Sequence, residues 1–415
     1  MKAEIIAVGT EILLGDIINT NAQFLSKELA SIGIGVYRQE VVGDNEERLL
    51  EALGEALSRS DIVITTGGLG PTGDDLTKET ACKYFKMNLE LHKESYEVLE
   101  SMFKRVGREV TKSNLKQVYF PKEAKVLPNP NGTAPGAILE KNNKIIIILP
   151  GPPREMKPMY IDYVKDFLKP MGNGVIKSEV VRVLGLGESF AAEKLKDIIE
   201  AGINPTVAPY AKEDDVIFRI TASGKDEEEA LRLIKPTKEA VISKLELDYY
   251  GEGEDTTIEE VVANLLISKK LTISTAESCT GGMIASRLIN FPGISEVFLE
   301  GAVTYSNEAK VRTLDVKEDT LTKYGAVSEE TAKEMAIGIS KRTGSDIGIV
   351  TTGIAGPGGG TEEKPVGLVY IGLYYKGKIK AYRHVFNGNR AEVRRRATIT
   401  ALDKVRRAIL QDNIV

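Results

Sequence analysis

The chain has 415 residues, 42% of them apolar and 28% charged, which is typical of a globular protein with more than one core. Its formal net charge of −5 gives no support to nucleic-acid binding, which needs a broad cationic surface. The two cysteines, Cys82 and Cys279, stand far apart, as expected of free thiols in a reducing compartment. No secretory signal is recognisable, and the longest aliphatic run, residues 145–149, is far shorter than the roughly 20 residues of a membrane-spanning helix. We therefore expect a cytoplasmic protein that binds no membrane and no nucleic acid directly.

Short apolar runs alternate with amphipathic stretches over residues 1–170. Strands are predicted at 3–9, 36–42, 61–68 and 144–151, with helices beginning near Asn21 and Asn45, running from Asp75 to about Val106, and ending near Leu168. An alternating order of strands and helices favours a parallel sheet covered by helices on both faces. This first part is therefore predicted to be an α/β domain.

Two breaks divide the rest of the chain. Pro170, Gly172 and Gly174 form the first break, and the sequence GEGEDT at 251–256 forms the second. Residues 171–252 are predicted to be a small α+β linker or dimerisation domain, with helices at 190–200 and 226–247. Residues 253–415 again show strands and helices in alternation. The predicted fold class is thus two three-layer α/β domains with mainly parallel sheets, joined by a small α+β domain, and we expect a homodimer.

A glycine-rich loop, TTGGLGPTGDD at 65–75, lies between a predicted strand and a predicted helix. Backbone N–H groups in such a loop can hold phosphate oxygens. Pro71, and the position of the loop after the third strand, make a dehydrogenase fingerprint improbable. Asp74 and Asp75 would repel a phosphate unless a divalent cation lay between them, so they are the candidate metal ligands. In the alternative interpretation, Asp75 only caps the following helix.

Three further loops are expected at the same edge of the sheet, at 8–21, 129–136 and 149–156. Asn19 or Thr20 could equally be a helix N-cap. The candidate residues of this N-terminal site are Thr10, Glu11, Asn19, Asn21, Gly67, Gly68, Gly70, Thr72, Asn131 and Glu155.

The sequences GTEILLGDIINTN, TTGGLGPTGDDLT and LPGPPREM resemble the signature loops of the MoaB/MogA-like molybdopterin-binding fold as it occurs in the CinA (competence/damage-inducible) family. The resemblance covers residues 1 to about 168. It implies an ADP-ribose pyrophosphatase that depends on a divalent metal of unknown identity. Molybdopterin binding, or a nucleotide site without turnover, stays open as an alternative.

In the last domain, the sequence AESCTGG at 276–282 follows a strand and is predicted to open a helix. Ser278, Cys279, Thr280 and Gly281 would then lie where a helix N-terminus stabilises negative charge. In the alternative interpretation, Ser278 or Thr280 is only the N-cap and Cys279 is a buried small residue.

A nucleophilic serine needs a base. The chain has two histidines, His92 in another domain and His384 on a predicted strand, so a lysine is the remaining candidate. Lys310, in VTYSNEAK, could form a Ser-Lys dyad with Ser278, and Tyr305 in the same turn could bind substrate or relay a proton. A rival dyad uses Cys279 with Lys310 and Glu277.

A second glycine-rich loop, at 351–367, and the start of the terminal helix complete this candidate site. Thr352 could donate a hydrogen bond, and Gly353 lets the backbone approach a ligand closely. Arg390 and Arg394, four residues apart on one helical face, suit a phosphate. A solvated basic helix is the simpler interpretation of Arg395, Arg406 and Arg407. No cluster of metal ligands is seen in this half, so no cofactor is expected there.

The sequences AESCTGG, VTYSNEAK, GAVSEETA, GIAGPGGGTEEKPVG and GNRAEVRRRA resemble the CinA C-terminal, or nicotinamide-nucleotide amidase, domain over residues 256 to about 410. The resemblance implies hydrolysis of nicotinamide mononucleotide (NMN) to nicotinate mononucleotide and ammonia. In this reaction Ser278 would attack the carboxamide and Lys310 would transfer the proton. N–H groups near Gly281 or Gly353 would contact the oxyanion, and Arg390 would bind the phosphate. The rival hypothesis is a competence- or DNA-damage-associated binding protein without turnover.

Overall fold

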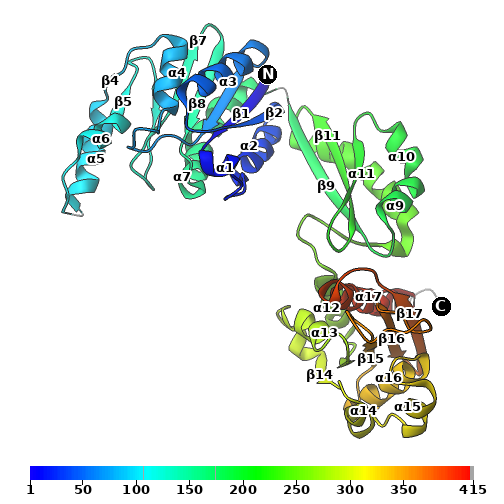
Figure 1. The fold of residues 1–415 in the computed structure, drawn as a ribbon. Helices are drawn as coiled ribbons and strands as arrows, with labels where there is room; N and C mark the ends of the chain where they lie inside the picture. Colours follow the sequence, from blue (N-terminus) through cyan, green and yellow to red (C-terminus); the bar gives the residue numbers. More distant parts are fainter. Residues whose placement is uncertain (106, 173, 412–415) are drawn as a thin grey trace. The chain divides into compact units, whose positions relative to one another are not determined.

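The computed structural model describes residues 1–105, 107–172 and 174–411. The chain forms two compact units, one of Met1–Lys177 with Thr221–Ile234 and the other of Ser178–Ile220 with Lys235–Val415. Within the described residues, no helix is both long and apolar enough to cross a membrane. Figure 1 draws the chain as a ribbon and labels helices and strands where there is room.

The first sheet has six strands in the order β2-β1-β3-β8-β7-β6. Four of them run parallel, and β7 and β6 are antiparallel additions at one edge. The strand bounds are β1 Lys2–Val8, β2 Gly35–Val42, β3 Ile62–Thr66, β6 Lys125–Leu127, β7 Gly136–Lys141 and β8 Lys144–Leu149. The order β2-β1-β3 places a topological switch point beside β1, which is where open α/β sheets bind ligands.

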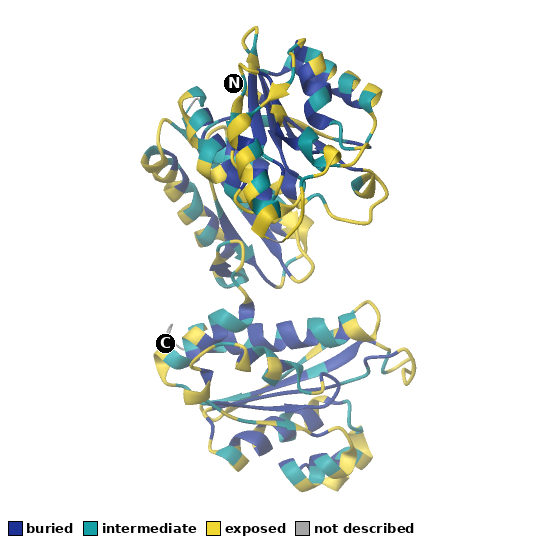
Figure 2. Cartoon of the chain, turned by 90° about the vertical axis from the view of Figure 1, so that its left-hand side faces the viewer, coloured by how far each residue is buried: buried dark blue, intermediate teal, exposed yellow. Residues whose placement is uncertain are grey.

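Helices cover both faces of this sheet. Ile5 packs in a core with α2 and α7, whereas its neighbour Ile6 packs in the opposite core with α3 and α4. Because both faces are buried, successive residues of the strand are apolar, as the sequence predicted. Figure 2 shows the inner strands of this sheet in dark blue between helices whose outer faces are exposed. The helix bounds are α1 Thr10–Leu13, α2 Thr20–Ser31, α3 Glu46–Arg59, α4 Thr77–Phe85, α7 Pro153–Met159 and α8 Lys165–Leu168.

The long helical stretch predicted from Asp75 is wrong in detail. After α4, Lys86 adopts a left-handed conformation with φ 52°, which ends the helix, and a short strand β4 Glu90–Leu91 pairs with β5 Tyr119–Phe120. Helix α5 then runs over Lys93–Arg105, followed by the short helix α6 Lys112–Leu115. The predicted end near Val106 lies outside the described residues.

Strands β6 and β7 were missed from the sequence. The turn from β7 to β8 is formed by Asn142 and Asn143, both with positive φ. This asparagine pair between two apolar runs is a hairpin signal that could have located β7.

The middle sheet has the order β10-β11-β9-β12. Its strands are β9 Val175–Val183, β10 Thr206–Ala211, β11 Val216–Gly224 and β12 Tyr249–Glu252. The helix predicted at 190–200 is two helices, α9 Glu188–Lys194 and α10 Lys196–Ala201, and the last helix is α11 Glu227–Leu245.

The third sheet has the order β14-β13-β15-β16-β17. The first three strands are parallel and the last two antiparallel. Helices α12, α13 and α17 pack on one face, and α14 and α16 on the other. The predicted fold class is therefore confirmed. The bounds are β13 Ile273–Glu277, β14 Phe298–Val303, β15 Ile347–Gly353, β16 Leu368–Tyr375, β17 Lys378–Val385, α12 Ile258–Lys269, α13 Met283–Ile289, α14 Asn307–Leu314, α15 Glu318–Tyr324, α16 Glu329–Thr343 and α17 Arg390–Gln411.

Candidate active sites

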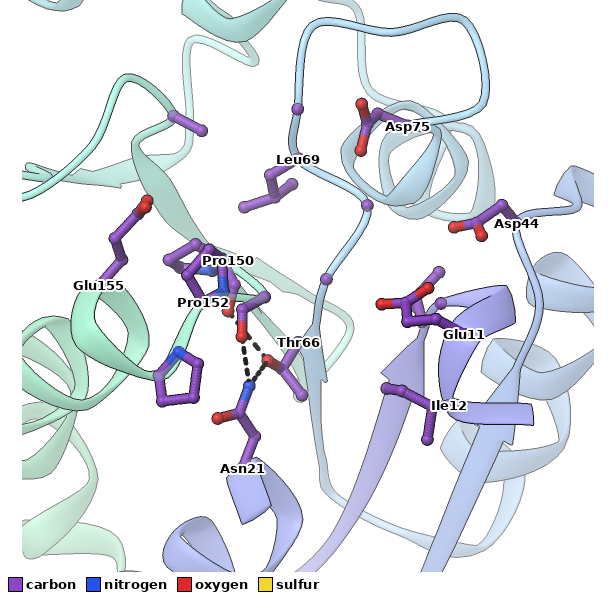
Figure 3. A pocket seen from close by; sticks show the side chains of 18 of the residues that line it. Glu11, Ile12, Asn21, Asp44, Thr66, Leu69, Asp75, Pro150, Pro152 and Glu155 are labelled. Atoms are coloured by element: carbon purple, nitrogen blue, oxygen red, sulfur yellow. Dashed lines mark hydrogen bonds between the residues drawn. The ribbon is translucent and has the colours of Figure 1, made fainter. Parts of the chain in front are cut away.

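A pocket of about 580 Å³ opens where β1, β3 and β8 end at the carboxyl edge of the first sheet (Figure 3). Thr10, Thr72 and Asn131 belong to the predicted loops but do not line the pocket. Asp44 lines it and was missed, although it follows the end of β2 at the same edge. The predicted residues that do line the pocket are Glu11, Asn19, Asn21, Gly67, Gly68, Gly70, Asp74, Asp75 and Glu155.

Asn21 lies on the floor of the pocket with a fixed amide orientation. Its Nδ2 donates to the carbonyl of Gly151 at 2.7 Å and to Oγ1 of Thr66 at 2.9 Å (Figure 3). Because a main-chain carbonyl can only accept, Nδ2 must face Gly151. Asn19 is the N-cap of α2, as the alternative interpretation held, and its Oδ1 accepts from the N–H of Ala22.

The glycine-rich loop is held by its own carboxylate. Oδ2 of Asp75 accepts from the backbone N–H of Thr72 at 3.0 Å and also from the Thr72 hydroxyl. Helix α4 begins at Thr77 without a side-chain cap, so the interpretation of Asp75 as a helix cap is wrong. Both donors of Thr72 are used inside the loop, which is why this residue stabilises the loop instead of facing the pocket.

Lys116 and Gln117, which were not predicted, hold the same loop through side-chain hydrogen bonds. Nζ of Lys116 donates to the carbonyls of Thr72, at 3.1 Å, and Asp75. Nε2 of Gln117 donates to the carbonyl of Leu69 at 3.2 Å. These bonds span more than 40 residues of sequence, and no local pattern signals them.

Glu155 and Thr10 are positioned by neighbours on other loops. Oε2 of Glu155 accepts from Nδ2 of Asn129 at 2.8 Å, while Thr10 donates its N–H and its hydroxyl to Oδ2 of Asp44. Nδ2 of Asn131 donates to the carbonyl of Arg154, in the first turn of α7, at 3.4 Å.

The fit of this pocket to a metal ion is partial. Asp74 is exposed, and the nearby Thr72 hydroxyl lowers the pKa of its carboxyl group, so the carboxylate is ionised at neutral pH. Among residues 1–105, 107–172 and 174–411, no group of three or more His, Cys, Asp or Glu side chains could hold a metal ion by itself. Magnesium is commonly held by one or two carboxylates together with substrate phosphates, and Asp74 with Asp75 could supply that part.

The second candidate site surrounds the turn after β13. Ser278 does not lie at a helix N-terminus as predicted, because α13 begins at Met283 with Gly282 as its N-cap. The N-cap interpretation of Ser278 and Thr280 is therefore wrong as well. The helix terminus is occupied by Glu277, whose buried carboxylate accepts from the N–H groups of Gly282, Ile284 and Ala285 at 2.9–3.1 Å. Glu277 thus fixes the turn that carries Ser278.

Ser278 and Lys310 lie side by side, as predicted. Nζ of Lys310 is 3.3 Å from Oγ of Ser278, and it donates to the carbonyls of Thr304 at 2.9 Å and Tyr305 at 3.2 Å. The Lys310 side chain is 1% exposed, and this burial lowers its pKa. A neutral amine has two N–H groups, which the two carbonyls would take, leaving its lone pair for the Ser278 hydroxyl.

Cys279 is poorly suited to be the nucleophile. Its side chain is buried, and burial raises the pKa of its thiol to about 11, so the thiol is protonated at neutral pH. Because the thiolate is the nucleophile, the thiol form is unreactive.

The polar groups of three more predicted residues are occupied within the fold. Oγ1 of Thr352 donates to the carbonyl of Ala326, and Oγ1 of Thr280 bonds with Oγ1 of Thr351. The N–H of Gly281 donates to the carbonyl of Ser278 at 3.1 Å, so it is unavailable for the oxyanion contact expected there. Gly353 pairs with Val369, and a Cβ on it would come within 2.7 Å of the Leu368 carbonyl.

Arg390 and Arg394 both reach the site from the first turns of α17, but they differ in what they contact. Arg390 is exposed and donates to the carbonyl of Gly356 at 2.8 Å and the hydroxyl of Tyr305 at 3.2 Å. Arg394 donates to the carbonyls of Cys279 at 3.0 Å and Thr280 at 2.9 Å. Arg390 can therefore meet a ligand, whereas Arg394 holds the turn of Ser278.

The interpretation of the other α17 arginines as a solvated face is wrong. The Arg406 side chain is 2% exposed and the Arg407 side chain 21%. They pair with Asp403 and donate to the carbonyls of Leu184, Leu247 and Tyr249, which belong to the middle region, the segment from β9 to β12. Arg395, 16% exposed, pairs with Glu213 and Asp214.

Fold and sites define a class of protein: an α/β domain with a pocket at its switch point, a small antiparallel module, and an α/β domain with a buried serine–lysine pair. Three family models match in this order. They are the probable molybdopterin binding domain over residues 4–170, the damage-inducible protein CinA KH domain over 178–251, and the CinA C-terminal domain over 255–409.

Similar proteins extend over nearly the whole chain. A competence-damage inducible protein of Clostridium beijerinckii is 61% identical over 99% of this chain and 100% of its own length, and one of Clostridioides difficile is 58% identical over 98% and 99%. The chain therefore belongs to the CinA competence/damage-inducible family. Among solved structures, the competence/damage inducible protein CihA of Agrobacterium tumefaciens is 40% identical, covering 37% of this chain and 98% of its own, with a TM-score of 0.35.

Proposed function

We propose that the C-terminal domain is an amidase that hydrolyses NMN to nicotinate mononucleotide and ammonia. The observation that carries this proposal is the 3.3 Å contact between Nζ of the buried Lys310 and Oγ of Ser278. The carbonyls of Thr304 and Tyr305 accept two N–H groups of this lysine, so in the neutral amine the lone pair is left for the Ser278 hydroxyl. A binding protein would need neither a nucleophile nor a base.

The proposed reaction begins when Oγ of Ser278 attacks the carboxamide carbon and its proton passes to Nζ of Lys310. Lys310 then gives that proton to the leaving nitrogen, which departs as ammonia, and an acyl ester on Ser278 remains. Water hydrolyses the ester, with Lys310 acting again as base. The lowered pKa of Lys310 supports this role, because only the neutral amine can accept the proton.

Arg390 is proposed to bind the 5′-phosphate of NMN. Its guanidinium lies at the exposed side of the site, between the Gly356 carbonyl and the Tyr305 hydroxyl. Arginine is well suited to a phosphate because its planar fork can donate two parallel hydrogen bonds. Tyr305, 62% exposed, is placed to contact the same ligand.

The decisive experiment measures ammonia release from NMN by the full chain without added metal. We expect activity in the wild type and in Cys279→Ala, and a loss of more than about a thousandfold in Ser278→Ala. An inactive wild type would refute the amidase proposal and favour the binding-protein hypothesis. Activity lost in Cys279→Ala but kept in Ser278→Ala would move the nucleophile to the thiol.

For the first domain we propose a divalent-metal-dependent hydrolysis of ADP-ribose. The glycine-rich loop beside the ionised Asp74, at the mouth of a 580 Å³ pocket, supports a site for a metal-bound diphosphate. The reaction itself comes from the family resemblance and not from the fold. The homodimer remains a prediction.

A further inference from the structure

We infer that the middle region positions the amidase site, acting through Asp214 on the two helices that flank the Ser278 turn. This inference rests on the proposed amidase function. It concerns the hairpin tip between β10 and β11, and helices α13 and α17, all of which belong to one compact unit.

Helix α17 contacts both the Ser278 turn and the middle region. Its first turns hold the site, since Arg394 donates to the carbonyls of Cys279 and Thr280. The next residue, Arg395, pairs with Asp214 of the hairpin tip. Further along, Nη1 of Arg406 donates to the carbonyl of Tyr249 at 2.8 Å, and Nη2 of Arg407 to that of Leu184 at 2.9 Å. The same helix that fixes the catalytic turn is therefore itself fixed by the middle region.

Asp214 also reaches the second helix that flanks the turn. Its Oδ2 lies 3.6 Å from Nη2 of Arg287, in the last part of α13, and Nη1 of Arg287 lies 3.4 Å from Oε2 of Glu259. The other end of α13 is held by Glu277, the residue before Ser278. Asp214 thus links α13, which follows the catalytic turn in the chain, to α17, which donates to carbonyls of that turn.

The position of Asp214 is set by its neighbour. The Asp215 side chain is 3% exposed, and its Oδ2 accepts from Nε of Arg182 at 2.8 Å and from the hydroxyl of Tyr250 at 2.6 Å. A buried, hydrogen-bonded carboxylate resists displacement, so Asp215 holds the hairpin tip, and with it Asp214, in one position.

The composition of the middle region favours this role over nucleic-acid binding. A KH domain clamps a nucleic-acid backbone with a Gly-x-x-Gly loop, whereas here α9 and α10 are joined by the single residue Leu195. Residues 178–251 also carry fifteen acidic and ten basic side chains, which disfavours a polyanion.

The first test compares Asp214→Ala with Asp197→Ala in the full chain. Asp197 is a matched control because it forms an exposed ion pair with Lys244 elsewhere in the same region. Loosening the turn should lower kcat for NMN about tenfold in Asp214→Ala, with KM changed less than about twofold, because misplaced reacting groups slow the chemical step. Asp197→Ala should match the wild type. The double variant Asp214→Ala with Arg395→Ala should have nearly the same kcat as Asp214→Ala alone, since the two residues share one interaction.

A second readout does not depend on activity. In a Cys82→Ala background, Cys279 is the only thiol, and it lies buried in the turn that Arg394 holds. We expect N-ethylmaleimide to label Cys279 several-fold faster in Asp214→Ala than in the wild type or in Asp197→Ala. Equal labelling rates and an unchanged kcat would overturn the inference. If the wild type shows no amidase activity, the proposed function fails while the labelling still tests the positioning.

Discussion

Nζ of Lys310 lies 3.3 Å from Oγ of Ser278, and both side chains are buried. Lys310 comes from α14 and Ser278 from the turn after β13, so two neighbouring parallel strands deliver the pair to one edge of the sheet. Because burial disfavours the charged form of lysine, the same packing that brings the residues together also favours the neutral amine that the proposed base requires.

The rate of NMN deamidation should rise with pH. Burial lowers the pKa of Lys310. The neutral amine therefore becomes the major form at a lower pH than in an ordinary lysine, whose pKa is about 10.4. We expect kcat to increase with pH and to level off with an apparent pKa below that value, measured by ammonia release at saturating NMN. Lys310→Arg, which stays protonated, should lose at least about a hundredfold. A flat profile together with an active Lys310→Arg variant would contradict the role of Lys310 as base.

Arg390→Ala should weaken binding of NMN. Removing a hydrogen bond to a charged phosphate costs about 1.5–3 kcal/mol, which corresponds to a rise in KM of roughly 10- to 100-fold. The matched control is nicotinamide riboside, the same substrate without the phosphate, whose turnover should be equally poor in the wild type and the variant. An unchanged KM for NMN would show that the phosphate binds elsewhere.

Glu277→Gln should destabilise the C-terminal domain. The buried carboxylate accepts from three N–H groups at the start of α13, and an amide replaces one acceptor oxygen by a donor. We expect the midpoint of urea unfolding, measured by circular dichroism, to fall. Glu318→Gln, an exposed change in the first turn of α15, should have little effect. Equal midpoints for the two variants would mean that Glu277 does not hold the turn.

Lys116→Met should lower the proposed activity of the N-terminal site and leave that of the C-terminal site unchanged. The lysine donates to the carbonyls of Thr72 and Asp75, so its loss frees the glycine-rich loop. We expect release of AMP from ADP-ribose to fall about tenfold while NMN deamidation is unchanged. Lys112→Met, an exposed change in the same segment, is the control. The outcome that contradicts this prediction is wild-type AMP release by Lys116→Met.

A chelator should separate the two proposed activities. With EDTA present, ADP-ribose hydrolysis should stop and NMN deamidation should continue, and added Mg²⁺ should restore the former. Asp74→Asn should raise the Mg²⁺ concentration needed for half-maximal hydrolysis, because the ionised carboxylate is lost. Chelator-resistant ADP-ribose hydrolysis would argue against the metal.

The sequence predicted the α/β architecture because strands buried on both faces are mostly apolar, without an alternation of apolar and polar residues. Ile5 and Ile6, which pack in opposite cores, illustrate this. It did not predict the break of the helix at Lys86, where one left-handed residue interrupts a helical pattern, and it missed β7, which the turn at Asn142 and Asn143 could have located. The pairing of Ser278 with Lys310 was predicted from residue type and loop position, since loops after neighbouring parallel strands meet at one edge.

The chain itself therefore determines the order of its elements, the edge at which its loops gather, and the residue types in them. Only the tertiary structure decides which polar groups remain available. Asp75 bonds to its own loop, Glu277 caps α13, and Arg394 holds carbonyls more than a hundred residues away. Hydrogen-bond partners are chosen by proximity in space, and proximity between distant segments is set by packing, which no local pattern records.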